Sequence, residues 1–193
     1  MNLVADIALA HRLADAAGAA IRPHFRAGLG SESKDDATPV TLADREAEEA
    51  MRGIFKADAM GDGIIGEELG SHDGSTGRQW VLDPIDGTVS FIAGRPIFGT
   101  LIALVVEGFP VLGIIDQPIL GERWAGASGR PTTFNAAPCQ TRRCRELSGA
   151  MLATTGPHYF DDHDGAHFMA LAARTDHRRM MIDRKSTRLN SSH

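Results

Sequence analysis

The spacing of apolar residues changes once along this chain, near Gly61, and this change separates an expected helical part from an expected strand-rich part. Before it, apolar side chains recur every three or four residues, which is the period of an amphipathic α-helix. After it, short apolar runs rich in β-branched residues alternate with turn residues, which is typical of strands. The first helical stripe comprises Leu3, Ile7, Ala10, Ala14, Ala17, Ile21 and Phe25.

Two helices are expected before the sheet. The first stripe predicts a long helix that ends near Gly28, and the polar, glycine-containing stretch from Gly28 to Pro39 predicts a loop. A second helix is expected to begin at Thr41, because Thr41 and Asp44 form an approximate capping box before a new apolar face.

Glu107 and Gly108 predict a tight reversal between two strands, which indicates an antiparallel meander. A further helix is predicted over residues 164–174. The expected fold is therefore α/β, a layered sandwich in which an N-terminal helix pair packs on a largely antiparallel sheet. The expected strands cover residues 64–65, 79–82, 98–106, 109–115 and 122–125.

Composition excludes several classes of protein. The 193 residues are 42% hydrophobic, enough to bury a core, but no apolar run reaches the roughly 18 residues of a membrane helix. A net charge of -5 disfavours nucleic-acid binding through phosphate neutralisation. The N-terminus lacks the basic start and apolar centre of a signal peptide, so a cytoplasmic location is expected. Cys139 and Cys144 are too few for a disulfide framework or a structural zinc site, and free thiols are expected.

Residues 183–193 are basic, rich in serine and contain a single leucine, so no packed element is expected there. A nucleic-acid-binding arm is one interpretation, but the segment has no aromatic residue to stack on bases. The favoured interpretation is a non-native junction. Residues 1–181 are then expected to form the domain, and residues 182–193 a foreign tail.

The segment QWVLDPIDGT, residues 79–88, carries the most chemistry. An apolar strand leads into Asp83 and Asp86 in an expected turn. These carboxylates and the carbonyl of Ile85 are oxygen ligands of the kind that Mg²⁺ prefers, and Mg²⁺ leaves coordination positions for a substrate phosphate. Thr88 is expected to cap a following helical turn and to offer its hydroxyl to a phosphate oxygen. The alternative is an Asx-type turn whose acids are solvated.

A second apolar strand, Ile64–Ile65, leads into Glu67 and Glu68, so two strand ends would aim acids at one point. Such a site suits two metal ions. One cation lowers the pKa of a bound water, and the other stabilises the leaving oxygen of an in-line displacement. Hydrolysis of a phosphate ester is the reaction that this arrangement suits best.

Three segments together resemble the inositol monophosphatase superfamily of Mg²⁺-dependent phosphatases: GEE (Gly66–Glu68), DPIDGT (Asp83–Thr88) and P-V-T-x-A-D (Pro39–Asp44). The runs Phe91–Pro96 and Gly113–Trp124 are most similar to its bacterial histidinol-phosphatase branch, which dephosphorylates L-histidinol phosphate in histidine biosynthesis. The resemblance covers roughly residues 3 to 180. It implies a hydrolase for a small phosphorylated metabolite, with two or three Mg²⁺ ions, and relatives are often homodimers.

The resemblance also implies a role for each motif residue. Glu67 and Thr88 would position the attacking water, and Asp44 would hydrogen-bond to Thr88. Gly87 and Thr88 would hold the phosphate through backbone N–H groups. The implied metal ligands are Glu67, Asp83, the Ile85 carbonyl and Asp86, and the implied substrate-binding residues are Ile85, Asp86, Gly87 and Thr88.

Other interpretations stay open for three of the neighbouring residues. Asp44 would serve equally as a helix-capping acid. Glu68 is interpreted as a solvated neighbour of the site. Lys34 lies in the loop that covers the site in relatives, where it would bring a further cation or water.

The sequence departs from the family's pattern after Trp124. Relatives continue into a second lobe that supplies a W-D-x-A-like aspartate for the second metal, and no Trp-Asp pair follows Trp124 here. Losing that carboxylate and half of the pocket would weaken metal binding and substrate positioning, so an inactive metal-binding fragment is an alternative of another class. Val89 stands where the histidinol-phosphatase branch often has Arg, which keeps an inositol phosphate or related small ester as the alternative substrate.

Two further patterns are set aside. Gly61–Gly66 matches G-x-G-x-x-G, but the match precedes a strand and no helix is expected after it, unlike a dinucleotide fingerprint. His163 and His167 lie four residues apart near Asp164 and would suit a transition metal if helical. Because Gly165 lies between them and no zincin-type Glu is present, they are interpreted as surface residues.

Overall fold

The computed structural model describes residues 3–27, 39–59, 61–154, 160–175 and 181–182. The chain divides into two compact units, Met1–Gln140 and Thr141–His193. The loop with Lys34 and the tail 183–193 lie outside the described residues.

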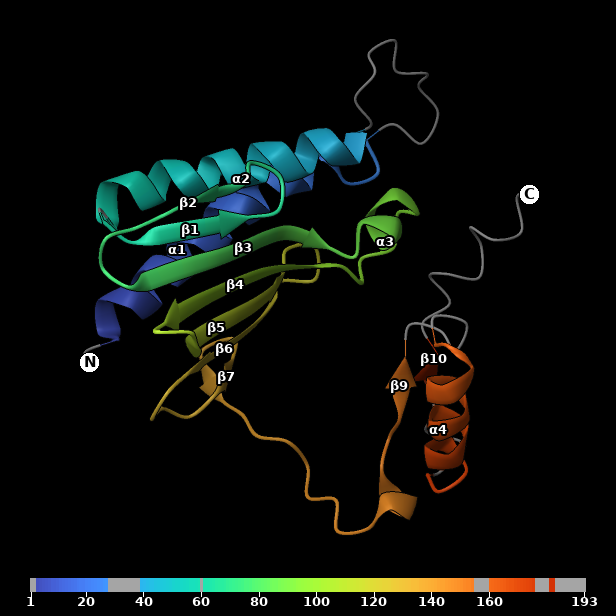
Figure 1. Cartoon of the computed structure of the whole chain (residues 1–193). Coiled ribbons are helices and arrows are strands. Elements are labelled where there is room, and N and C mark those ends of the chain that lie inside the picture. Colours follow the sequence, from blue (N-terminus) through green and yellow to red (C-terminus); the bar gives the residue numbers. More distant parts are fainter. Residues whose placement is uncertain (1–2, 28–38, 60, 155–159, 176–180, 183–193) are drawn as a thin grey trace. The chain divides into compact units, whose positions relative to one another are not determined.

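The first unit contains an eight-stranded sheet with strand order β2-β1-β3-β4-β5-β6-β7-β8 (Figure 1). All neighbours pair antiparallel except β1 and β3, which are parallel. The predicted meander and the largely antiparallel sheet are confirmed. The strands are β1 Gly63–Gly66, β2 Ser71–His72, β3 Arg78–Asp86, β4 Gly99–Val106, β5 Phe109–Gln117, β6 Glu122–Ala127, β7 Thr133–Phe134 and β8 Ala137–Pro138.

Two long helices, α1 (Val4–Ile21) and α2 (Pro39–Asp58), pack against each other and cover one face of this sheet (Figure 1). Their contact faces carry small side chains, with Ala14 and Ala17 on α1 and Ala43 on α2 completely buried. Small residues let the two helix axes approach closely. Among the described residues, no helix has the length and apolar character needed to cross a membrane.

The end of α1 and the start of α2 differ from the prediction, because a proline lies at each of these boundaries. The first helix stops at Ile21, well before Gly28, and the chain continues as a 3₁₀ turn, Arg22–His24, that contains Pro23. The second begins at Pro39, since proline is well suited to the first position of a helix. The predicted start at Thr41 is wrong.

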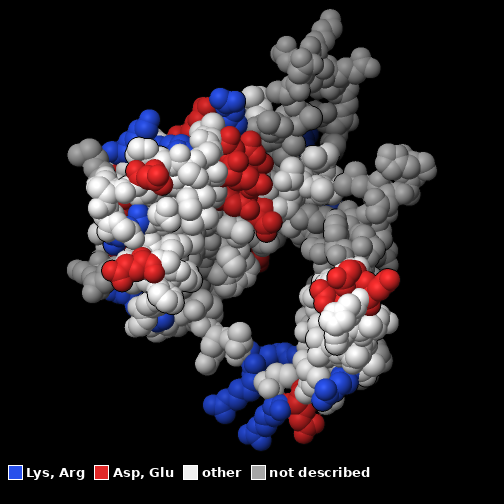
Figure 2. All heavy atoms as spheres, in the orientation of Figure 1, with Lys and Arg blue, Asp and Glu red and all other residues white. Residues whose placement is uncertain are grey.

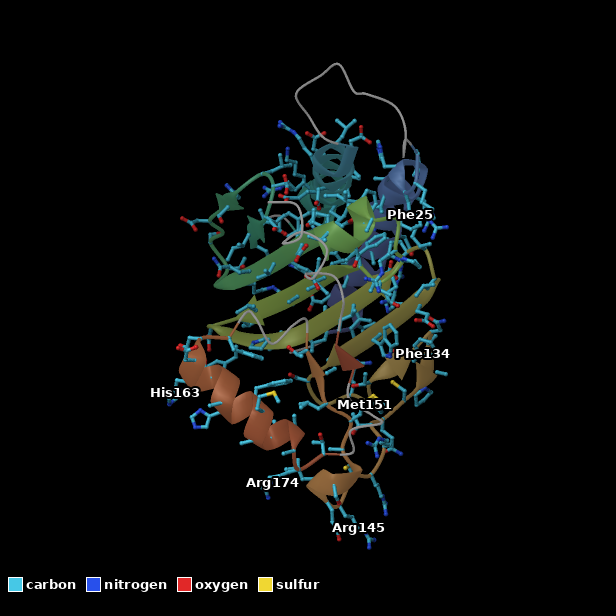
Figure 3. All side chains as sticks on the ribbon, turned by 90° about the vertical axis from the view of Figure 1, so that its right-hand side faces the viewer. Phe25, Phe134, Arg145, Met151, His163 and Arg174 are labelled. Carbon is cyan, nitrogen blue, oxygen red and sulfur yellow. The ribbon has the colours of Figure 1, made fainter. Side chains whose placement is uncertain are left out.

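Aromatic side chains fix the short helix α3 (Thr88–Ile92), which follows β3. The ring of Phe25, labelled in Figure 3, lies 5.8 Å from that of Phe91 in α3 and 5.6 Å from that of Phe98 beside β4. Phe91 and Phe98 are themselves in edge contact at 5.1 Å. Such clusters bury large apolar areas, so they hold α3 against the segment that follows α1 and its 3₁₀ turn.

Strand β3 extends to Asp86, whereas the sequence predicts a turn after Leu82. The pairing with β4 shifts register between Asp83 and Asp86, which marks a bulge at Pro84, where the backbone has no N–H to pair. The buried hydroxyl of Thr100 donates to the Pro84 carbonyl at 2.8 Å. Asp83 and Asp86 therefore lie at an irregular end of β3 that the hydrogen bond from Thr100 stabilises.

Thr100→Val is expected to lower the free energy of unfolding by about 1–2 kcal/mol, because it leaves the buried Pro84 carbonyl without its donor. Urea denaturation measures the change. Thr133→Val is the matched control, because its half-buried hydroxyl contacts the Ala125 carbonyl only at 3.5 Å. Equal losses in the two variants would contradict the role of Thr100.

The second unit contains helix α4 (Asp162–Ala172), the 3₁₀ turn Leu147–Gly149, and a two-stranded parallel sheet of β9 (Ala153–Thr154) and β10 (Met181–Ile182). The predicted helix is confirmed, but it begins two residues earlier. Asp161 caps it by accepting the N–H of Asp164 at 2.7 Å. Cys139 and Cys144 are free thiols, as expected.

Candidate active site

The parallel pairing of β1 and β3 brings two acidic segments to one edge of the sheet. Ile64 pairs with Trp80 and Gly66 with Leu82, so the register extended by one residue places Glu67 opposite Asp83. The carboxyl ends of parallel strands point to the same edge. The Glu67 and Asp83 carboxyl groups are hydrogen-bonded to each other. The structure thus brings together the two strand ends that the sequence paired.

Asp44 approaches this pair from α2. It is the sixth residue of the helix and only 5% exposed, a position that does not fit the alternative of a helix-capping acid. Its Oδ1 atom is buried without a hydrogen-bond partner among the described residues, and so is the Oδ1 atom of Asp83. Buried acceptors without donors are rare in folded proteins and indicate a missing partner.

The pKa values of two site residues show how strongly the acids repel. Burial, followed by the charge of Glu67, raises the pKa of Asp83 to about 7, and Asp86 and Asp44 contribute. Burial and the charges of Glu68 and Glu67 raise the pKa of Asp44 to about 7 as well, although a hydrogen bond with the Ile85 backbone opposes the shift. Such a site holds protons near neutral pH unless a cation replaces them.

The acids form an inner and an outer group. Asp44 is buried and Asp83 is half-buried, while Glu67, Glu68 and Asp86 are exposed to solvent. Figure 2 shows a continuous band of acidic side chains over the region of α2 and the ends of β1 and β3. The outer carboxylates are accessible to water, and the inner ones have oxygen atoms without a hydrogen-bond donor among the described residues. Such a set of oxygen ligands fits a hard cation such as Mg²⁺.

In the metal-free protein, the free energy of unfolding is expected to fall as the pH rises from about 5 to about 8. Unfolded aspartates titrate near pH 4, whereas Asp44 and Asp83 keep their protons up to about pH 7 in the folded state. The folded state therefore binds more protons in this window, so raising the pH favours unfolding. Urea denaturation in EDTA across this range checks the slope, and a free energy that rises would contradict it.

Gly87 and Thr88 start α3 in a way that corrects one prediction. Gly87, with φ of 100°, occupies the cap position, and Thr88 is the first helical residue instead of the cap. The Thr88 hydroxyl donates to the Ile85 carbonyl at 3.3 Å. A hydroxyl has one proton, so the implied hydrogen bond from Thr88 to Asp44 is not formed in this structure.

Glu48 is a residue of this region that the sequence analysis missed. It lies one turn after Asp44 on α2, is completely buried, and accepts the backbone N–H of Glu68 at 2.8 Å. The signal was present, because Asp44, Glu48 and Arg52 repeat every four residues and therefore share one helix face.

The structure describes both patterns that were set aside. The G-x-G-x-x-G match is followed by β2 and not by a helix. His163, Asp164 and His167 lie on α4 with one ligand atom each within 4.8 Å of the others, but all three are exposed, and His163 projects outward in Figure 3. This agrees with their interpretation as surface residues.

Comparison with known proteins defines the class: residues 3–185 match the Inositol monophosphatase family, and the chain belongs to that family. Among individual relatives, it is 52% identical to "Bifunctional phosphatase IMPL2, chloroplastic" of Arabidopsis thaliana over 80% of this chain and 45% of that protein. It is 42% identical to a histidinol-phosphatase of Chlorobaculum parvum over 84% of this chain and 63% of that protein.

A solved structure has the same fold. An inositol monophosphatase from Zymomonas mobilis matches with a TM-score of 0.83 and 48% identity, covering 98% of this chain and 73% of the other. The expected fold class is confirmed. The chain spans about half the length of the curated relatives it matches.

Proposed function

We propose that this chain is the cation-binding part of a Mg²⁺-dependent phosphomonoesterase that hydrolyses L-histidinol phosphate to L-histidinol and phosphate. The observation that carries the proposal is the convergence of acids from α2, β1 and β3, with two buried carboxylate oxygens that have no partner in the part of the chain that the structure describes. The matches to histidinol-phosphatases of Chlorobaculum parvum and Mycobacterium tuberculosis, at 42% and 46% identity, support the substrate. The proposal includes a cytoplasmic enzyme of histidine biosynthesis that acts as a homodimer.

The ligands that would hold Mg²⁺ are Glu67, Asp83, Asp86 and the Ile85 carbonyl. When bound, two such ions lower the pKa of a water and stabilise the leaving oxygen. The Thr88 hydroxyl donates to Ile85 and keeps its lone pairs free, so it can accept a hydrogen bond from the attacking water. The carboxylate of Glu67 is exposed and faces Asp83, so it would act as the general base that takes that water's proton.

The phosphate would bind where β3 ends. The backbone N–H groups of Thr88 and Val89, the first two residues of α3, have no partner inside the helix, and Gly87 has no Cβ to keep an anion away. Ile85 and Asp86 would line the same position from the strand side. An inositol phosphate is the second candidate substrate, supported by the 35% identity to an inositol-1-monophosphatase of Mycolicibacterium smegmatis.

The proposal is tested by phosphate release from L-histidinol phosphate and from inositol 1-phosphate, each with Mg²⁺ and with EDTA. We expect release only with Mg²⁺ and a kcat/KM at least about tenfold higher for histidinol phosphate, which is a typical size of discrimination between related substrates. Release from inositol phosphate alone would replace the substrate. Calorimetric Mg²⁺ binding without any release would instead identify a metal-binding fragment.

Asp86→Asn is expected to abolish Mg²⁺ binding and to leave the unfolding midpoint nearly unchanged, because Asp86 is exposed and supplies a ligand but little packing. Asp73→Asn, an exposed acid outside the cluster, is the matched control. Unchanged Mg²⁺ affinity in Asp86→Asn would refute its role as a ligand.

A further inference from the structure

Glu48 is a buried acid that no step of the proposed reaction uses. None of its surface is exposed, although a carboxylate without compensation is costly to bury. It is compensated by Arg52, one turn further along α2, whose Nε donates to Glu48 Oε1 at 2.8 Å. Replacing a buried ion pair by apolar residues is often neutral or stabilising, so the pair itself is weak evidence for a contribution to stability.

The other partners of this ion pair belong to one segment, residues 66–70, which we call the Glu67 turn. Glu48 Oε2 accepts the N–H of Glu68 at 2.8 Å, and Oε1 accepts that of Leu69 at 3.3 Å. Arg52 donates to the carbonyl of Gly70. Two residues of α2 thus bind three consecutive residues of the turn.

Gly66 shows how closely Glu48 approaches this turn. A Cβ atom at Gly66 would lie 1.9 Å from Glu48 Oε1, so the carboxylate packs directly on the Gly66 backbone. The N–H of Gly66 donates to the Gly70 carbonyl at 3.1 Å and closes the turn. Glu67 is therefore held by contacts on both sides of it.

We propose that Glu48 is a positioning residue: with Arg52 it fixes the Glu67 turn to α2, so that the Glu67 carboxylate stays facing Asp83. The inference rests on the proposed function for its catalytic meaning, and on the hydrogen bonds of the turn for its structure. Because α2 also carries Asp44, the same helix sets the place of both acids that approach Asp83. A displacement of the turn by about 1 Å would be enough to separate the ligands of one cation.

The test compares the 193-residue chain with Glu48→Gln, which keeps the size of the side chain but loses its charge and at least one of its two backbone hydrogen bonds. In metal-free protein, amide exchange at Glu68 and Leu69 is expected to accelerate at least about tenfold, while the amides of β4 and β5 keep their rates. Calorimetry is expected to show Mg²⁺ affinity weakened at least about tenfold, a usual effect of losing a group that orients a ligand.

Three controls separate positioning from loss of folding. Glu49→Gln makes the same change one residue further along, where the side chain is exposed and paired with Arg45, and should alter neither readout. Leu13→Ala lowers overall stability from α1 and should keep the Mg²⁺ dissociation constant of the folded protein. In Gly66→Ala, the new methyl group is expected to displace the Glu48 side chain. Because both substitutions act on one contact, the double variant Glu48→Gln/Gly66→Ala should lose less Mg²⁺-binding free energy than the sum of the two single losses.

The proposal is overturned if the Glu68 and Leu69 amides exchange at the wild-type rate in Glu48→Gln, or if this variant binds Mg²⁺ as the wild type does. Failure of the wild type to bind Mg²⁺ would refute the proposed function instead. The exchange measurement would then still decide whether Glu48 fixes the Glu67 turn, because it is made without metal.

Discussion

Asp83→Asn is expected to stabilise the metal-free protein and to weaken Mg²⁺ binding strongly, two effects of opposite sign from one substitution. Asp83 is half-buried and faces Glu67, Asp86 and Asp44, which together with burial raise its pKa to about 7. At pH 8 its charge opposes folding, so the neutral amide should raise the free energy of unfolding by on the order of 1 kcal/mol after solvent screening.

The same change removes a ligand charge, so the Mg²⁺ dissociation constant should rise at least about 100-fold. Urea denaturation in EDTA and calorimetric titration with Mg²⁺ measure the two effects on the same samples. Asp73→Asn, which removes an exposed charge outside the cluster, should change neither. A destabilised Asp83→Asn that still binds Mg²⁺ would show that Asp83 is a structural acid.

Trp80→Ala should have the largest effect on stability, about 3–5 kcal/mol, because the large Trp80 side chain is completely buried in β3. Its Nε1 atom also donates to Asp62 at 3.0 Å, at the opposite end of β1 from Glu67. Although burial opposes it, the pKa of Asp62 is lowered by hydrogen bonds from Thr76, Arg78 and Trp80.

Trp80→Phe separates packing from this hydrogen bond. It keeps most of the buried area and should cost about 2 kcal/mol, as expected for a hydrogen bond to a charged group. Urea denaturation at pH 7 measures both variants. A wild-type free energy of unfolding for Trp80→Phe would show that Asp62 needs only Thr76 and Arg78.

The periodicity of the sequence predicts most of the fold, because the spacing of apolar residues in a helix or strand shows which of its side chains are buried. The five expected strands all exist, and Glu107–Gly108 does join β4 to β5. The short strands β2, β7 and β8 were not expected. The other errors lie at element ends, where Pro23 and Pro39 decide the boundary, and at β3, which continues through a bulge that depends on the distant Thr100. A local pattern does not contain such a long-range contact.

The candidate site, too, could be predicted from the sequence only in part. Glu67 and Asp83 could be paired from sequence because each ends an apolar run, and neighbouring strand ends share an edge. The direction of the Thr88 hydroxyl could not be predicted, since it depends on which acceptor lies nearer in the folded chain. Glu48 was hidden because a charged residue on a helix is usually solvated, and only the packing of the Glu67 turn reveals its burial.

The assembly of the acids from one helix and two parallel strands ties cation binding to chain folding. Only the folded protein gathers Asp44, Glu67 and Asp83 at one point, so an ion bound there would add its binding free energy to that of folding by mass action. The magnesium concentration around the protein would then set its folded fraction as well as its occupied fraction.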